Sequence, residues 1–361
     1  MDLSWTDEDI SWAASLRARL SSPDDGIATG GSPKSLADAE ITRQLLPGPG
    51  PGRSLASPER AMLAMIEHGR ALLDFPVVEM VVLPAQLLAV NRVFEVLENA
   101  VAEGAGDLAV AWQEPDLGDN FAMRSEPVAG VWRLSGRKSI VVGGPRACRF
   151  VVAARAGETA QIFLIEADSP GLSLSPYMMI DGRHAADLVL DSVGVTPANL
   201  IASGDAAEHL LARALDVATA ANCAQAVGMM RFLLDATAGF LKARQQFGQA
   251  LSSFQVLQHR VVDMLLHAEM AEAATLRAML SLDLEGDQRG LAVSAAKVTT
   301  GAAARFVGQS AIQLHGGQGM RDATVATRYF RRLTAFDLAF GNGPDHLARV
   351  SAGGSASLAT A

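Results

Sequence analysis

The hydrophobic pattern changes period twice along the chain, and this change is the strongest constraint on its fold. Up to about residue 105 and from about residue 205 onward, apolar residues recur at the spacing of amphipathic helices. Between these regions, short runs rich in Val, Ile and Phe are separated by Gly, Pro, Asp and Ser turns, as in an antiparallel sheet. We therefore predict an α-β-α fold with an N-terminal helical domain (1–105), a middle antiparallel β domain (106–201) and a C-terminal four-helix-bundle domain (202–361).

Composition excludes several classes of function. The chain has 361 residues and a net charge of −9, so it lacks the positive charge that binding along a phosphate backbone requires. Its two cysteines, Cys148 and Cys223, form neither a disulfide framework nor a metal-type spacing. The most apolar stretch, FPVVEMVVLPAQLLAV, is interrupted by Glu79 and Pro84 and is too short to span a bilayer, and the acidic N-terminus does not resemble a signal peptide. We expect a soluble, cytoplasmic protein with no nucleic-acid partner, no membrane span and no metal site.

Three short segments carry the chemical information. ARQQFGQALSSFQVLQ (243–258) places an arginine at a helix junction, and AIQLHGGQGM (311–320) ends a helix on a glycine pair. An arginine can neutralise a phosphate, and a glycine pair lets a backbone approach a ligand closely. Taken singly, each also has a structural interpretation, as a solvated helix end or a helix C-cap. The third segment, AFDLAFGNGPDHLAR (335–349), reads as an active-site loop but presents a phenylalanine where an acid or base is expected.

Together, in this order and on this frame, the segments resemble the acyl-CoA dehydrogenase family over nearly the whole chain. In that family, an R-x-x-F-G junction and a Q-x-x-G-G turn bind the ADP part of FAD, notably of the FAD held mainly by the neighbouring subunit. A further FAD contact lies in the helix after the junction. The resemblance therefore implies a set of FAD-binding residues at the matching positions: Arg244, Phe247, Gln255, Gln313, Gly316 and Gly317.

Two middle-domain segments also resemble the family but depart from its pattern. WQEPDLGDN (112–120) is similar to the T-E-P-x-x-G-S-D flavin loop, and LSGRKSIVVGG (134–144) is similar to the L-N-G-x-K-x-W-I-T-N strand. The departures remove a hydroxyl that bonds the flavin near N5, and set a carboxylate against a phosphate. We therefore expect that this chain's own isoalloxazine pocket is degraded, at four positions: Gln113, Asp119, Ile140 and Val142.

The family's catalytic base is missing from both of its known positions. The base is a glutamate in a Y-E-G-T loop, and an ungapped count from the glycine pair places Phe340 on it. In members that resemble isovaleryl-CoA dehydrogenase the glutamate lies on the first long C-terminal helix, where this chain has Ala218. A positioned general base contributes about 10²- to 10⁴-fold in rate, and phenylalanine has no lone pair for this work. Asp216 lies two residues from Ala218, on a different helix face, and we interpret it as a structural or solvated acid.

Four other polar residues are candidates with simpler interpretations. Asp337 and Asp345 flank the Phe340 loop as a turn acid and a helix-start acid. His315 lies next to the glycine pair, and we interpret it as a packing residue or a dinucleotide contact. His346 begins a terminal helix and has no partner visible in the sequence.

The resemblance implies a subunit of an FAD-dependent acyl-CoA dehydrogenase that lends half of an FAD site to a catalytic partner. It is similar to the smaller, base-less subunits of bacterial α2β2 acyl-CoA dehydrogenases, which act on CoA thioesters of sterol side chains and similar bulky acids. The implied partners are an acyl-CoA, a second acyl-CoA dehydrogenase-like subunit and an electron-transferring flavoprotein as acceptor. Three alternatives stay open: a self-sufficient homotetramer with Asp216 as its base, a flavin monooxygenase of this family, and a structural paralogue without flavin.

Overall fold

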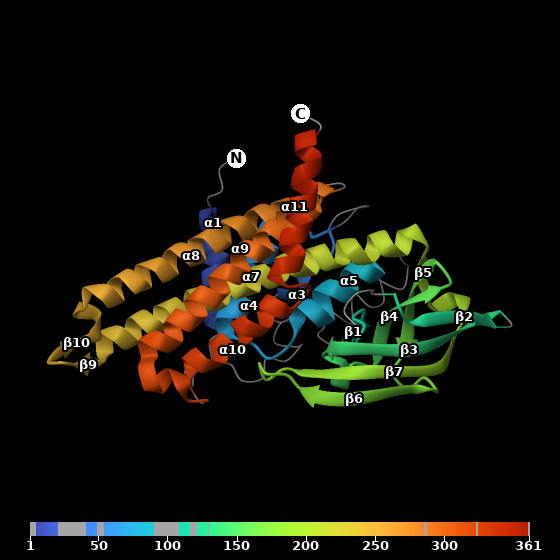
Figure 1. Ribbon diagram of the computed structural model, residues 1–361, viewed down its shortest axis with the longest axis horizontal. Helices are drawn as coiled ribbons and strands as arrows, with labels where there is room; N and C mark the ends of the chain where they lie inside the picture. Colours follow the sequence, from blue (N-terminus) through green and yellow to red (C-terminus); the bar gives the residue numbers. More distant parts are fainter. Residues whose placement is uncertain are drawn as a thin grey trace. The chain divides into compact units, whose positions relative to one another are not determined.

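The computed structural model describes most of the chain, in eight ranges. These are residues 5–20, 41–48, 54–89, 108–115, 121–128, 130–284, 287–322 and 324–359. The α-β-α fold class predicted from the hydrophobic period is confirmed, because helices precede and follow a single large sheet (Figure 1). Within the described ranges, no helix combines the length and the apolarity that crossing a bilayer requires.

The chain divides into two compact units. A helical unit contains residues 1–29, 57–73 and 219–361, and a β unit contains residues 30–56 and 74–218. Each unit is built from segments that are far apart in the sequence. The three-domain boundaries predicted from the sequence stay a prediction.

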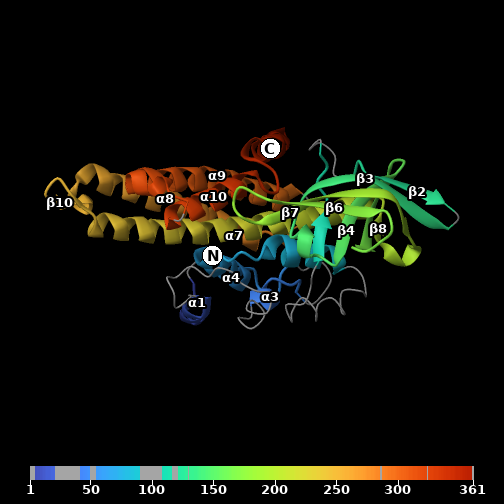
Figure 2. The ribbon, with the colours of Figure 1, turned by 90° about the horizontal axis from the view of Figure 1, so that it is seen from below.

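The helical unit is a bundle in which α9 packs along both α8 and α10 (Figure 2). Its long helices are rich in alanine, so that neighbouring backbones can approach closely. Its elements are α1 (Asp7–Leu20), α4 (Pro58–Ala71), the part of α7 (Asp205–Ala243) from residue 219, α8 (Gln255–Leu280), α9 (Asp287–His315), the 3₁₀ turn η5 (Gly316–Met320), α10 (Val325–Leu338) and α11 (Gly343–Ala359).

Local capping sets where two of these helices begin. The Oγ atom of Ser57 accepts a hydrogen bond from the backbone N–H of Arg60 at 3.3 Å, and Pro58 occupies the first helical position of α4. The Oγ1 atom of Thr324 accepts from the backbone N–H of Thr327 at 3.4 Å at the start of α10. Both caps satisfy backbone donors that a helix start leaves without an intrahelical partner.

Glycines allow α4 and α7 to lie in direct backbone contact. A Cβ atom added at Gly228 of α7 would lie 1.9 Å from the carbonyl oxygen of Ile66 in α4. A Cβ atom added at Gly69 of α4 would lie 2.0 Å from the carbonyl oxygen of Gln225 in α7. Each helix therefore supplies one glycine to the crossing point, and the side chain of Gln225 bonds His68 at 2.8 Å beside it.

The β unit is a sheet with the strand order β6-β7-β3-β2-β4-β5-β8, and β1 pairs with β4. Most pairings are antiparallel, but β1–β4 and the short β2–β4 contact are parallel. The strands are β1 (Leu108–Ala111), β2 (Arg124–Val128), β3 (Val131–Val142), β4 (Arg149–Ala156), β5 (Thr159–Glu166), β6 (Leu172–Met178), β7 (His184–Val195) and β8 (Leu200–Ser203). The shorter helices of this unit are α3 (Ile41–Gln44), the π-helix η1 (Val78–Val82), α5 (Leu83–Leu88), η2 (Gly144–Arg146) and η3 (Pro197–Asn199).

Buried charge pairs fix the loops at the edge of the sheet. Arg183 is buried and donates to Glu79 of η1 at 2.6 Å and to Asp181 at 2.7 Å, so it joins the β6–β7 hairpin to the π-helix. Lys138 of β3 is fully buried and pairs with Glu114, which also accepts from the backbone N–H of Met123 at 3.0 Å. The core beneath is formed by apolar residues of β1, β3, β4, β5 and β7.

We expect Gly228→Ala to destabilise the protein by about 1–3 kcal/mol or more, because the added methyl group overlaps a backbone oxygen that cannot rotate away. Gly239→Ala, in the same helix, is the matched control. A Cβ atom there meets nothing within 4 Å, so it should stabilise by roughly 0.5–1 kcal/mol through helix propensity. Urea unfolding of the two variants measures both effects, and equal midpoints would contradict the close-contact argument.

Candidate functional site

A strained hairpin lies between α7 and α8. Its two short strands, β9 (Gln245–Gln246) and β10 (Gln249–Ala250), are joined by Phe247 and Gly248. The φ angles of these two residues are 56° and 80°, the left-handed pattern of a type I′ turn, in which Asn, Asp or Gly normally takes the first place. Phe247 takes that place here and is 87% exposed. Its ring has one aromatic neighbour, Phe254, in an edge contact at 6.1 Å.

A cavity of about 520 Å³ opens beside this hairpin and brings together four of the predicted FAD-binding residues. Arg244, Gln313, Gly316 and Gly317 all line it, although the last three lie about 70 residues after the first. Phe247 and Gln255 do not line it, because Phe247 lies at the hairpin tip and Gln255 is an exposed residue at the start of α8. Other lining residues are Phe240, Gln246, Leu251, Leu257, Leu314, His315 and Gln318.

The chemistry of this cavity fits an anionic dinucleotide. Gly316 has a φ of 57°, and Cβ atoms added at Gly316 or Gly317 would meet nothing within 4 Å, so the backbone there borders open space. Arg244 is exposed, and among the described residues no carboxylate pairs with its guanidinium group. None of the residues that line the cavity is acidic. An unpaired arginine beside an exposed glycine backbone can hold a phosphate.

His315 has a defined orientation in the cavity. Its ring stacks on Phe240 of α7 with a centroid distance of 4.4 Å and an interplanar angle of 23°. Its Nδ1 atom lies 2.8 Å from the carbonyl oxygen of Ala311, one turn earlier in α9. His315 therefore packs against α7 and also lines the cavity, and a dinucleotide contact stays a prediction.

The loop that carries Phe340 is held by a buried lysine. Lys297 of α9 is 1% exposed, and its Nζ atom donates to the carbonyl oxygens of Phe336 at 2.5 Å and Ala339 at 2.8 Å, at the C-terminal end of α10. The ammonium group also lies 3.9 Å from the centre of the Phe336 ring. Burial lowers the pKa of Lys297 to about 8. The sequence analysis did not identify this residue.

The turn itself is strained and is fixed by His346. Phe340 and Gly341 have φ angles of 58° and 96°, and Phe340 is half-buried. His346 is buried, its Nε2 atom donates to the carbonyl oxygen of Phe340 at 3.0 Å, and its Nδ1 atom lies 3.0 Å from the Oγ atom of Ser294. A Cβ atom at Gly341 would lie 2.9 Å from Nε2, so a larger residue there would break this contact. His346 therefore has two partners that no sequence pattern indicated.

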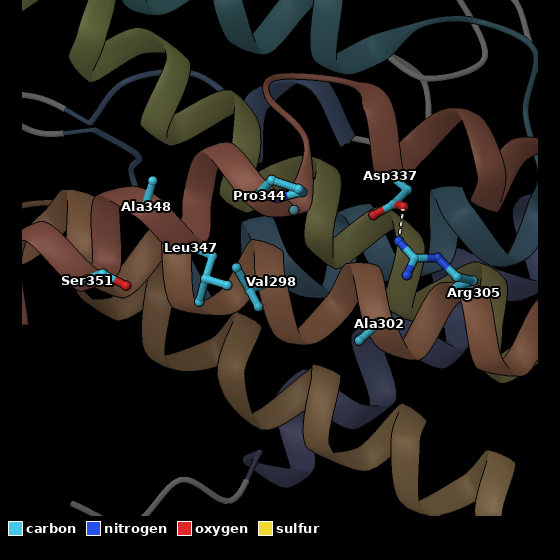
Figure 3. Close-up of a pocket in the computed structure, with 9 residues that line it drawn as sticks. Val298, Ala302, Arg305, Asp337, Pro344, Leu347, Ala348 and Ser351 are labelled. Atoms are coloured by element: carbon cyan, nitrogen blue, oxygen red, sulfur yellow. Dashed lines mark hydrogen bonds and ion pairs between the residues drawn. The ribbon is translucent and has the colours of Figure 1, made fainter.

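The two aspartates beside the turn have structural partners. Asp345 and Asn342 exchange hydrogen bonds at 3.0 and 3.2 Å across the start of α11. Asp337 pairs with Arg305 of α9 at 2.6 Å at one end of a second cavity, of about 500 Å³ (Figure 3). Val298 and Leu347 point toward one another in its middle, so its walls are mostly apolar (Figure 3).

The flavin-loop segments of the β unit show a distorted strand without the family's hydroxyl. Ile140 has a φ of 53°, which is rare for a β-branched residue, at an irregularity of the β3–β7 pairing. It is 39% exposed, and Val142 is half-buried. Gln113 accepts a backbone hydrogen bond from Ser139 at 3.0 Å through its carbonyl oxygen. Asp119 lies outside the described residues.

The second position of the catalytic base lies in a buried part of α7. Ala218 and Asp216 are both buried in α7, with exposed fractions of 0% and 3%. In the part of the chain that the structure describes, no three His, Cys, Asp or Glu side chains lie close enough together to hold a metal ion.

Comparison with known proteins supports the reading of the C-terminal region. The family model for the acyl-CoA dehydrogenase C-terminal domain matches residues 209–352. A probable acyl-CoA dehydrogenase of Bacillus subtilis, YngJ, is 29% identical over 226 residues, which are 60% of this chain and 59% of the relative. The acyl-CoA dehydrogenase FadE12 of Mycobacterium tuberculosis is 28% identical over 61% of this chain and 60% of the relative. The chain thus matches about three fifths of the length of these curated relatives.

Solved structures extend the likeness to nearly the whole chain. A steroid acyl-CoA dehydrogenase variant, Tcur3481–Tcur3483, is 26% identical with a TM-score of 0.82, covering 97% of this chain and 99% of that one. The ChsE4–ChsE5 complex of M. tuberculosis (21% identical, TM-score 0.83, coverage 97% and 98%) shows the same fold. So does a glutaryl-CoA dehydrogenase of M. smegmatis in complex with FADH2 (20% identical, TM-score 0.83, coverage 96% and 94%).

The fold is therefore that of the flavin-dependent acyl-CoA dehydrogenases. The resemblance to this family is confirmed, and residues 209–352 match the model of its C-terminal domain. Two solved structures with this fold, the glutaryl-CoA dehydrogenase and PigA, contain FADH2 and FAD.

We expect the stability of the protein to depend on pH through Lys297. Its pKa falls from 10.5 in the unfolded chain to about 8 in the folded protein, so between these values the unfolded state binds more protons. Stability from this group therefore rises as pH increases through about 8 to 10.5. Lys297→Met should remove this rise in urea unfolding measured from pH 7 to 10. A rise of the same size in the variant would show that other groups cause it.

Proposed function

We propose that this chain is the non-catalytic subunit of an FAD-dependent acyl-CoA dehydrogenase. It lends Arg244, Gln313 and the Gly316–Gly317 pair, which we call the cofactor clamp, to the FAD of a catalytic partner. One contrast carries the proposal. The cavity of the clamp is open, positively charged and free of acidic lining, whereas the turn at the base position is rigidly anchored and presents Phe340.

The clamp has a limited role in the chemistry. FAD, when bound, supplies the hydride acceptor, and the catalytic partner supplies the base for the substrate's α-proton. In this chain, Arg244 offsets phosphate charge, and Gly316 and Gly317 let their backbone approach the ligand without a Cβ atom in the way. No step requires a proton transfer by Phe340, which has no group for it.

Exposed apolar surface on α8 supports an assembly with a second subunit. Val262, Leu265, Leu266 and Met270 are exposed by 52%, 42%, 56% and 60%, and their spacing places them on one helix face. Because such a stripe is unfavourable in water, it fits contact with another polypeptide. The exposed ring of Phe247 fits the same role.

The proposed assembly, substrate class and electron acceptor rest on solved structures with the same fold. Two proteins with this fold are a steroid acyl-CoA dehydrogenase and the ChsE4–ChsE5 complex, which supports an α2β2 assembly acting on a bulky CoA thioester such as a sterol side chain. We propose an electron-transferring flavoprotein as the electron acceptor, and one solved structure that contains this fold (22% identical) is named for such a flavoprotein of Acidaminococcus fermentans. A cytoplasmic location accords with these partners.

The test is the flavin content of the chain, purified alone and co-expressed with the acyl-CoA dehydrogenase homologue encoded nearest to it. We expect a colourless chain alone and one FAD per pair of subunits in the complex, with Arg244→Ala lowering the flavin content of the complex. A yellow chain that desaturates an acyl-CoA by itself would overturn the proposal. Loss of that activity in Asp216→Asn would then identify the self-sufficient enzyme, and oxygen uptake by the reduced protein would identify a monooxygenase. Unchanged flavin content in the Arg244→Ala complex would leave only a structural role.

Phe247 offers a second test that separates folding from function. Phe247→Asn should stabilise the isolated chain by roughly 1 kcal/mol, because asparagine tolerates a positive φ and favours a type I′ turn. The same variant should bind FAD about tenfold more weakly in the complex, because it removes the exposed ring. Urea unfolding and flavin titration measure the two effects. A variant that is more stable and keeps its FAD would show that the ring has no role in the assembly.

A further inference from the structure

The hydrogen-bonding state of His315 is fixed by its partner. A carbonyl oxygen can only accept, so the Nδ1 atom that lies 2.8 Å from the carbonyl oxygen of Ala311 must carry the proton. In the neutral ring, Nε2 then has a free lone pair and acts as an acceptor. Among the described residues, none bonds this Nε2 atom. His315 therefore brings an available acceptor to a residue set that is otherwise rich in donors.

The ring that carries this acceptor cannot turn freely. Phe240 stacks on one face of it at 4.4 Å, and the bond to Ala311 fixes its edge. A Cβ atom at Gly319 would lie 2.6 Å from the carbonyl oxygen of Ile312 and 3.1 Å from the Cβ atom of His315, so the glycine lets η5 pack closely against the end of α9. Contacts from α7 and α9 thus hold the imidazole in one orientation.

The remaining cavity lining matches the parts of a nucleoside diphosphate. Leu251, Leu257 and Leu314 supply apolar surface for a flat base, and Arg244 supplies positive charge for a diphosphate. The glutamine amides at 246, 313 and 318 can donate to and accept from sugar hydroxyl groups. In this arrangement the Nε2 atom of His315 still has no hydrogen-bond donor facing it among the described residues. A donor on the nucleotide base would fill that place.

We propose that His315 is a specificity-determining residue of the cofactor clamp, with its Nε2 atom accepting from the exocyclic amino group of adenine. This inference rests on the proposed function. A 6-oxo purine presents a carbonyl oxygen at the same position, so two acceptors would face each other and one polar group would lose its partner. The clamp therefore selects adenine dinucleotides over their hypoxanthine equivalents.

The test compares ADP with IDP as ligands of the co-expressed complex after removal of its FAD, by isothermal titration calorimetry. We expect ADP to bind about tenfold more tightly than IDP, the effect of one unsatisfied hydrogen bond in a partly buried site. His315→Phe keeps a ring to stack on Phe240 but removes the acceptor, so it should bind the two nucleotides equally. Arg244→Ala is the matched control, and it should weaken both while keeping their ratio.

The possible failures are distinguishable. Equal binding of ADP and IDP by the wild-type complex would overturn the role of His315 and leave the clamp intact, and this comparison requires no variant to fold. A preference for ADP that persists in His315→Phe would assign the selection to another residue and would also overturn the inference. Absence of ADP binding by the flavin-free complex would overturn the clamp and, with it, the proposed function.

Discussion

The buried ammonium group of Lys297 is the interaction on which the geometry of the C-terminal bundle depends. It satisfies two carbonyl groups at the end of α10, and the negative end of the helix dipole offsets part of the cost of burying a charge. Gly301 and Arg305 follow on the same face of α9. A Cβ atom at Gly301 would lie 2.5 Å from a carboxylate oxygen of Asp337, which Arg305 binds. This face of α9 thus packs against α10 and determines where the last turn of α10 ends.

This anchoring explains how a strained turn persists in the folded chain. A phenylalanine at a positive φ costs about 1–2 kcal/mol, and such a residue persists only where its surroundings determine its conformation. Lys297 holds the residue before Phe340, and His346 holds its carbonyl oxygen. The backbone of the loop is therefore well defined, and it is the side chain at position 340 that has no acid or base.

The sequence predicted the parts of the fold and of the site that depend on local pattern. The hydrophobic period predicted the α-β-α order, and the resemblance to the acyl-CoA dehydrogenase family predicted the four residues that line one cavity. It could not predict the contacts of Lys297 or of His346 with Ser294, because these partners lie 39 to 52 residues apart. The parallel pairing of β1 with β4 is non-local in the same way. Phe247 and Gln255, which the same resemblance predicted as FAD contacts, lie outside the lining of this cavity, and their role stays a prediction.

Two features destabilise the chain when it is taken alone, and both lie on its surface. Phe247 has a strained φ angle and is 87% exposed, and neither property stabilises the fold of this chain alone. The apolar stripe on α8 is likewise unsatisfied in water. In contrast, the residues around Phe340 are anchored by buried hydrogen bonds, so folding already accounts for their conformation. Unfavourable exposure persists where a second polypeptide or a ligand covers it, so we expect the contacts of this chain with a partner to lie at Phe247 and on α8 rather than at the base-position turn.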